Sequence, residues 1–209
     1  MKKLSQYINI RRSQSTIKAT DATINKIVKG ELDRLGHDAD LNHIDTSEVT
    51  TLSDLFSCLD SDYLGSKYKD LNPDISKWNV SKVTHMMGTF YKCENFNSDL
   101  SKWDTGKVRF FNEMFSNCYK FNSDISGWDV PSALSMAYMF FDCKNFNQPL
   151  CDWDVSNTTN MESMFSNCES FLQDLSGWKL KEDTHISRGN MFDYTPMAKH
   201  KKYWPKFTV

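Results

Sequence analysis

The chain has 209 residues, of which 39% are hydrophobic and 25% are charged, and its formal net charge is −2. This length suits one domain, and the composition is that of a folded globular protein rather than of a disordered chain. Neither the apolar core of a signal peptide nor an apolar run long enough to span a membrane occurs. We therefore expect a cytoplasmic protein that makes no membrane contact, with a surface or virion component as the alternative.

Residues 1–39 are expected to form an N-terminal arm and a capping helix. The first 19 residues are polar and have few apolar anchors, which is typical of a mobile arm. A helix is predicted to begin at Asp21, and Gly36 suits its C-terminal end. One helical face carries the apolar side chains Ile24, Ile27, Val28, Leu32 and Leu35. We expect this helix to cover the first repeat, because the end of a stack otherwise exposes core and an unpaired edge.

Residues 40–192 carry a repeat with a period of 25 residues. Three of its columns are Trp78, Trp103, Trp128, Trp153 and Trp178; Phe90, Phe115, Phe140 and Phe165; and Cys93, Cys118, Cys143 and Cys168. A weaker copy begins at Asp40 and has an insertion around 61–69, and a truncated copy begins at Asp174. A fixed period of this size is typical of a solenoid, with atypical first and last coils. We therefore predict about six coils.

Two patterns alternate inside each coil. The segment 75–80 is short and rich in β-prone residues, which predicts one strand per coil. The apolar residues Val83, Met86, Phe90, Cys93 and Phe96 have the spacing of one helical face, which predicts a short helix or helical turn. The predicted fold class is therefore α/β, a solenoid with a parallel sheet on one face and short helices or helical turns on the other. The cysteine column is expected to be a row of free, inward-facing thiols.

The repeat can be written D-[I/L]-S-x-W-D-V-x-x-V-x-x-M-x-x-M-F-x-x-C-x-x-F-N. It resembles the BspA-type leucine-rich-repeat (LRR) surface proteins, and in particular the 25-residue variant of mycoplasma, gut bacteria and their phages. The resemblance covers Asp40 to about Phe192. It implies an LRR-like solenoid that binds proteins or adheres to surfaces, with no common catalytic site. Asn97, Asn122 and Asn147 resemble the buried asparagine ladder of that family.

Residues 193–209 are expected to form a C-terminal cap. Tyr203, Trp204 and Phe207 would plug the last coil, and the interleaved lysines would keep it soluble. The alternative for this basic aromatic tail is a contact with nucleic acid or another anionic surface.

Charge is distributed unevenly along the chain. Residues 1–35 carry eight basic and three acidic side chains, and residues 181–209 carry six and three, so the segment between them is acidic. An acidic body favours a partner protein with a basic surface and disfavours nucleic acid. The candidate partner-binding residues are variable strand positions and the carboxylates that follow the tryptophans: Lys77, Lys102, Asp104, Asp129, Asp152 and Asp154. The alternative role of the aspartates is to form turn hydrogen bonds.

Motifs that carry chemistry are missing from the sequence. It has no nucleophile beside a base at a recognised spacing, no G-x-G, no P-loop and no C-x-x-C. We therefore expect no enzyme activity, no catalytic residue, no cofactor and no metal. The predicted function is a non-catalytic protein-binding solenoid, such as a phage or mobile element could encode to bind or inhibit a host protein. The alternatives are a structural or adhesive component that self-associates, and nucleic-acid contact through the basic termini.

Overall fold

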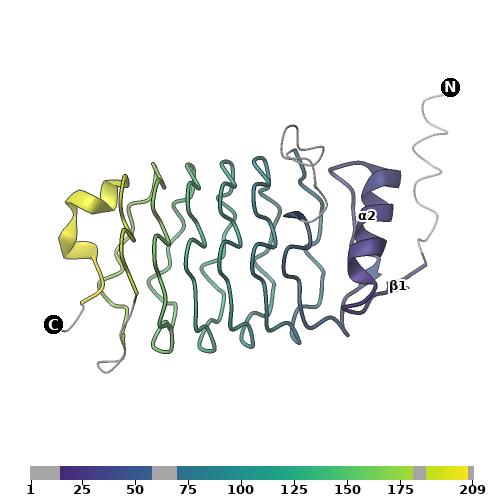
Figure 1. The fold of residues 1–209 in the computed structure, drawn as a ribbon, viewed down its shortest axis with the longest axis horizontal. Coiled ribbons are helices and arrows are strands. Elements are labelled where there is room, and N and C mark those ends of the chain that lie inside the picture. Colours follow the sequence, from purple (N-terminus) through teal and green to yellow (C-terminus); the bar gives the residue numbers. More distant parts are fainter. Residues whose placement is uncertain (1–14, 58–69, 181–186, 207–209) are drawn as a thin grey trace.

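The structure is a computed structural model that describes residues 15–57, 70–180 and 187–206. Its elements are β1 (Ile17–Lys18), α2 (Ile24–Leu35), β2 (Ile44–Asp45) and the 3-10 helices η3 (Pro196–Lys199) and η4 (Lys201–Tyr203). β1 and β2 pair in parallel, with Ile17 opposite Ile44. Between β2 and η3 the described chain runs as a row of coils that lie side by side along one axis (Figure 1). The insertion predicted around 61–69 lies outside the described residues.

Parallel bridges join each coil to the next at equivalent positions of the repeat. The column of bridged residues is Thr51, His85, Phe110, Ser135, Asn160 and Ser187. A further bridge pairs Asp40 with Asp74 near the N-terminal end. The strand that we predicted over 75–80 is instead a turn, in which the Trp78 N–H donates to the Ile75 carbonyl at 3.1 Å. The backbone ladder therefore lies at the His85 position, ten residues beyond the Ile75 position in the repeat.

The segment 83–96, which we expected to be helical, is a succession of turns. The N–H groups of Thr89 and Cys93 donate to carbonyls three residues earlier, at 3.4 and 2.9 Å. In between, the N–H groups of Phe90 and Lys92 donate to the next coil, both at 2.9 Å. The observed spacing fits either structure, because residues i and i+3 share a side in a helix and in a turn. A helix would use these N–H groups internally and leave none to join the coils.

Two positions of each coil have a left-handed backbone, which also excludes a helix there. The first column is Asp54, Gly88, Glu113, Tyr138 and Ser163, and the second is Lys92, Asn117, Asp142 and Asn167, all with φ between 51° and 63°. A positive φ at the third residue of a turn suits glycine or asparagine. Only part of each column satisfies this preference, so the stack imposes this conformation on the other residues.

The tryptophan column lies in the core and ties neighbouring coils together. Trp128 is 3% exposed, and its ring stacks on those of Trp103 and Trp153 at centroid distances of 6.4 and 6.3 Å. Its indole N–H donates to the carbonyl of Leu100 in the preceding coil at 2.9 Å. The other four tryptophans of the column donate in the same way. Each ring therefore supplies apolar burial and also satisfies a buried carbonyl.

The column cysteines are buried and lie beside backbone carbonyls. Cys118 Sγ lies 3.0 Å from the carbonyl oxygen of Phe90, and Cys143 and Cys168 make the equivalent contact. Burial raises the pKa of Cys93 to about 12, and it raises the pKa values of the other three as well. These thiols therefore stay protonated at neutral pH, and a nucleophilic role is disfavoured.

The asparagine ladder is present, but it is exposed and not buried as we expected. The Oδ1 atom of Asn97 accepts the backbone N–H of Asn122 at 2.7 Å, and Asn122 Oδ1 accepts that of Asn147 at 2.9 Å. Each side chain thus bridges adjacent coils along the surface. Because the ladder runs along an outer turn, water reaches these side chains without breaking it.

The N-terminal end of the stack lies against α2 (Figure 1). Ile24, Val28 and Leu32 of this helix join the core, whereas Leu35 is 37% exposed. Asp21, where we expected the helix to begin, lies three residues before α2 and accepts the backbone N–H of Thr50 at 2.7 Å. Residues 1–14 of the expected mobile arm lie outside the described residues. Its remainder includes β1, so the arm prediction is wrong for that part.

The C-terminal end is covered by residues 196–204. Trp204 packs on Phe192 with ring centroids 4.9 Å apart, and its indole N–H donates to the Met197 carbonyl at 2.8 Å. The carbonyl of Tyr203 accepts the N–H of Leu175 at 2.8 Å. The lysines of this segment are exposed, and Phe207 lies outside the described residues.

Candidate interaction surfaces

The six residues predicted to bind a partner are all exposed. They lie on the turns that carry the buried tryptophans, which we call the outer turns. They occupy two positions of the repeat, immediately before and immediately after the buried tryptophans: Lys77, Lys102, Asp104, Asp129, Asp152 and Asp154. The turns themselves are polar and carry no large apolar side chain at these positions. The surface therefore offers charge but little apolar area for a partner to bury.

Two of the four predicted aspartates, Asp104 and Asp154, accept a hydrogen bond from the residue two positions further along. Asp154 accepts the Ser156 N–H at 3.0 Å, and Asp104 accepts the Gly106 N–H at 3.4 Å. The bonds from the hydroxyl and the N–H of Ser156 lower the pKa of Asp154. Such side-chain-to-backbone bonds stabilise turns. This geometry supports the structural alternative for the aspartates.

Asp129 is the member of this column that has Pro131 two residues later. Proline has no N–H, so Asp129 cannot make the turn bond of Asp104 and Asp154. Its carboxylate lies beside the preceding coil, with Oδ2 3.5 Å from the position that a Cβ atom at Gly106 would occupy. Asp129 therefore lacks the turn bond that engages Asp104 and Asp154.

A different surface carries large side chains that sequence reasoning missed. We call it the ladder face and define it as the outer surface of residues 84–92, 109–117, 134–142 and 159–167. Its half-buried aromatic residues are Tyr91, Phe110, Tyr138 and Phe141. They were overlooked because we expected these segments to be helical. In a helix, the positions that vary between repeats would point to several different sides. Their signal in the sequence is aromatic residues at positions that are otherwise small or polar.

One part of the ladder face is a cationic and aromatic cluster. The rings of His85 and Phe110 stack with centroids 5.0 Å apart. The guanidinium carbon of Arg109 lies 5.7 Å from the centre of the Phe110 ring, within the range of a cation–π contact. Next to this cluster a shallow depression of about 480 Å³ is lined by Thr84, Lys107, Arg109, Pro131, Ser132, Leu134 and Asn157.

The second part of the ladder face surrounds Tyr138. Its hydroxyl donates to Glu162 Oε1 at 2.9 Å, and this hydrogen bond raises the pKa of Tyr138. The Tyr138 and Phe141 rings lie 5.9 Å apart at 59°. A depression of about 250 Å³ is lined by Tyr91, Glu113, Ser116, Asn117, Tyr138 and Phe141. Three aromatic rings, two of which carry a hydroxyl group, therefore line this hollow together with polar side chains.

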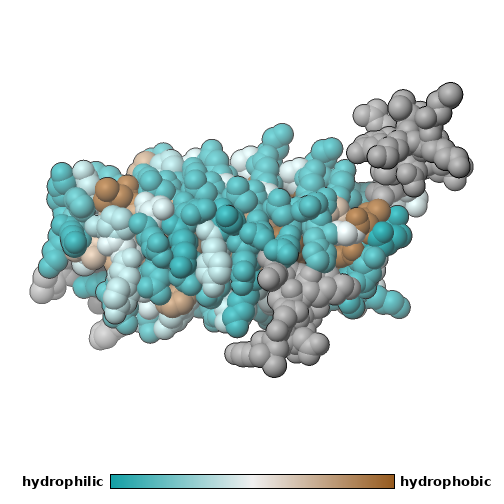
Figure 2. Space-filling view, turned by 90° about the horizontal axis from the view of Figure 1, so that it is seen from above, coloured by the Kyte–Doolittle hydropathy of each residue, from teal (hydrophilic) through white to brown (hydrophobic). Residues whose placement is uncertain are grey.

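The described residues give no evidence for two other classes of site, a metal centre and a membrane-spanning helix. No group of three or more histidine, cysteine, aspartate or glutamate side chains in that part of the chain is arranged to hold a metal ion. Among the described helices, none has the length and apolarity to cross a membrane. The side of the molecule seen in Figure 2 is hydrophilic over most of its length, with isolated hydrophobic patches.

A family model described as "Mycoplasma protein of unknown function, DUF285" matches residues 32–134 and 111–204. The two matches overlap and together cover most of the chain, so the protein belongs to this repeat family. The expectation of a mycoplasma-type repeat is thus confirmed at the level of the family. No curated protein and no solved structure matches the chain.

Proposed function

We propose that this chain is a non-catalytic, LRR-like solenoid related to the BspA-type surface proteins, and that it binds another protein through the ladder face. The observation that carries the proposal is the row of half-buried aromatic residues beside Arg109. Tyrosine, phenylalanine and arginine are enriched at the centres of protein interfaces, and a few such residues supply most of the binding energy.

The contrast with the outer turns supports this choice of surface. Asp104 and Asp154 already accept turn hydrogen bonds, so using them for a partner would sacrifice local structure. The aromatic rings of the ladder face are held in place by their neighbours, as His85 holds Phe110. They lose little conformational freedom on binding, which favours affinity.

The acidic charge of the solenoid body, much of which lies on the outer turns and not beside Arg109, supports a partner whose surface is basic around the contact with the ladder face. The chain between the two basic termini is acidic, and complementary charge accelerates association. A host protein bound by a phage- or mobile-element product fits this reading. Adhesion as a surface or virion component is the second form of the same activity. In both forms the solenoid acts as a binding scaffold and catalyses no reaction.

The experiment is affinity capture from a lysate of the source organism or its host with three forms of the tagged chain. These are the wild type, the ladder-face variant Phe110→Ala/Tyr138→Ala, and the matched control Lys102→Ala/Asp129→Ala. We expect one stoichiometric protein with the wild type and the control, and at least tenfold less with the ladder-face variant, because interface hot spots contribute about 2 kcal/mol or more each.

Circular dichroism shows whether each variant is folded. If the control variant loses the captured protein and the ladder-face variant does not, the binding site lies on the outer turns and not on the ladder face. Recovery of only the tagged chain, in a size that grows with concentration, would favour self-association. Recovery of nucleic acid that is released by salt would favour the basic termini.

A further inference from the structure

The last coil ends the ladder with backbone donors that face no further coil. In the coil before it, alternate N–H groups donate to the last coil, namely those of Met161, Ser163, Phe165 and Asn167. Three of the equivalent donors of the last coil are the N–H groups of Asn190, Phe192 and Tyr194. None of these three N–H groups has an acceptor among the described residues. The φ angles of 59° at Asn190 and 57° at Tyr194 repeat the two left-handed positions of the earlier coils.

The two ends of this edge, Asn190 and Tyr194, are exposed, whereas Phe192 between them is 3% exposed and packs against Trp204. Asn190 is exposed, whereas Ser163, its equivalent one coil earlier, is 5% exposed. Tyr194 is 82% exposed. Three donors at alternate residues are thus presented in the geometry that binds carbonyl groups elsewhere in the stack. A sheet edge of this kind binds an added segment through main-chain hydrogen bonds.

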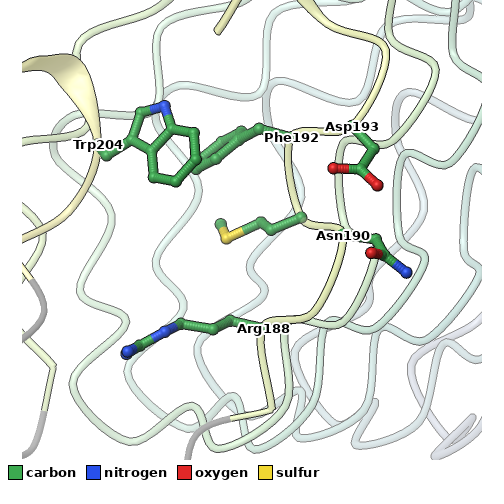
Figure 3. Close-up of a pocket in the computed structure, with 6 residues that line it drawn as sticks. Arg188, Asn190, Phe192, Asp193 and Trp204 are labelled. Carbon is green, nitrogen blue, oxygen red and sulfur yellow. The ribbon is translucent and has the colours of Figure 1, made fainter. Parts of the chain in front are cut away.

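A cavity of about 300 Å³ lies directly beside these donors. It is lined by Arg188, Asn190, Met191, Phe192, Asp193 and Trp204. Figure 3 shows Arg188, Phe192 and Trp204 on one side of the backbone, and Asn190 and Asp193 on the other. The cavity therefore combines apolar walls with a guanidinium group. Its volume is at the lower end of ligand pockets, which span roughly 300–1,000 Å³.

The charge around the cavity is positive. The described residues from 187 to 206 include five basic side chains, Arg188, Lys199, Lys201, Lys202 and Lys206, and a single acidic one, Asp193. The four lysines are exposed. This end of the molecule consequently attracts an acidic segment, in contrast to the acidic body of the solenoid.

A second copy of the chain is a poor occupant of this edge. Two such edges cannot pair with each other here, because both present N–H donors and neither supplies the acceptors. The opposite end of another copy is covered by α2 (Figure 1). Donor polarity and the covering helix therefore both favour a different protein.

We propose that the edge formed by residues 188–194 and Trp204, called here the C-terminal edge, binds an acidic peptide segment of a partner protein. Carbonyl or carboxylate oxygens of the peptide accept the N–H groups of Asn190, Phe192 and Tyr194. One apolar side chain of the peptide enters the cavity between Arg188 and Trp204. This site is separate from the ladder face and does not depend on the function proposed for that face.

The test uses a labelled ten-residue peptide of alternating glutamate and leucine, and a lysine–leucine peptide of the same length as its control. Fluorescence anisotropy measures binding to the full chain, and nuclear magnetic resonance of the ¹⁵N-labelled chain locates it. We expect only the glutamate–leucine peptide to bind, with the largest amide shifts at Asn190, Phe192 and Tyr194. Equal binding of both peptides, or the largest shifts on the ladder face, would overturn the proposal.

Two variants change exposed lysines, so they test binding without removing a side chain from the core. Lys202→Glu is expected to weaken binding about tenfold, because it reverses the charge of an exposed lysine at the basic end that attracts the peptide. Lys120→Glu, an exposed lysine on the body, is the matched control and is expected to leave binding unchanged. Phe110→Ala/Tyr138→Ala must also leave it unchanged. Equal losses in Lys202→Glu and Lys120→Glu, or binding of a single-stranded DNA of the same charge but not of the peptide, would refute the acidic-peptide site.

Discussion

Replacing Trp128 by alanine tests whether the tryptophan column holds the coils together. The side chain is 3% exposed and stacks between Trp103 and Trp153 with interplanar angles of 3° on both sides. Truncating a buried aromatic residue to alanine costs about 3–5 kcal/mol. The Leu100 carbonyl would in addition lose its donor, which costs about 1–3 kcal/mol when the acceptor is buried. We expect Trp128→Ala to lose about 4–8 kcal/mol, a large fraction of the roughly 5–15 kcal/mol that stabilises a typical domain.

The variant Trp128→Phe separates the two contributions, because it keeps an aromatic ring and removes the donor. We expect it to lose about 1–3 kcal/mol. Equilibrium urea unfolding followed by circular dichroism measures both changes, with Lys102→Ala as an exposed neighbouring control. A loss below about 1 kcal/mol for Trp128→Ala would refute the packing argument. A Trp128→Phe variant as stable as the wild type would refute the role of the hydrogen bond.

Three further predictions concern individual features of the coils. Gly88→Ala should lose about 1–2 kcal/mol in urea unfolding, because φ is 57° there and the new Cβ would clash with the carboxylate of Asp54; Gly127→Ala, with open space around it, should be neutral or stabilising by up to about 1 kcal/mol. Hydrogen bonds lower the pKa of Asp124 below 3.8, so its stabilising effect is present above that pH and is lost as pH falls through the folded-state pKa. The melting-temperature difference between wild type and Asp124→Ala should therefore shrink between pH 6 and pH 3, and a constant difference would contradict this reasoning. Iodoacetamide should modify Cys151 in the folded chain while the four buried column thiols react only after unfolding, as mass spectrometry of the labelled peptides would show.

Much of the candidate site was beyond what the sequence could predict. The outer-turn residues, such as Asp104 and Asp154, were correctly expected to face solvent, but exposure does not reveal that their carboxylates are engaged in turn bonds. The aromatic residues of the ladder face are spread over three coils, and only the path of the backbone brings Tyr91, Tyr138 and Phe141 around one hollow. The open donors at Asn190 and Phe192 involve main-chain atoms, which no side-chain pattern reports.

The sequence by itself determined the period, the order of the coils and the residues that form the core. Columns of tryptophan, phenylalanine and cysteine can recur every 25 residues only if equivalent positions meet the same environment, and these columns are buried. Tertiary structure alone decided where the backbone ladder lies and which side chains meet on the surface beside it. Apolar spacings of three and four residues fit a helix and a succession of turns equally well. The choice between them depends on whether N–H groups such as that of Phe90 bond within their own coil or to the next one, and stacking of the coils sets that choice.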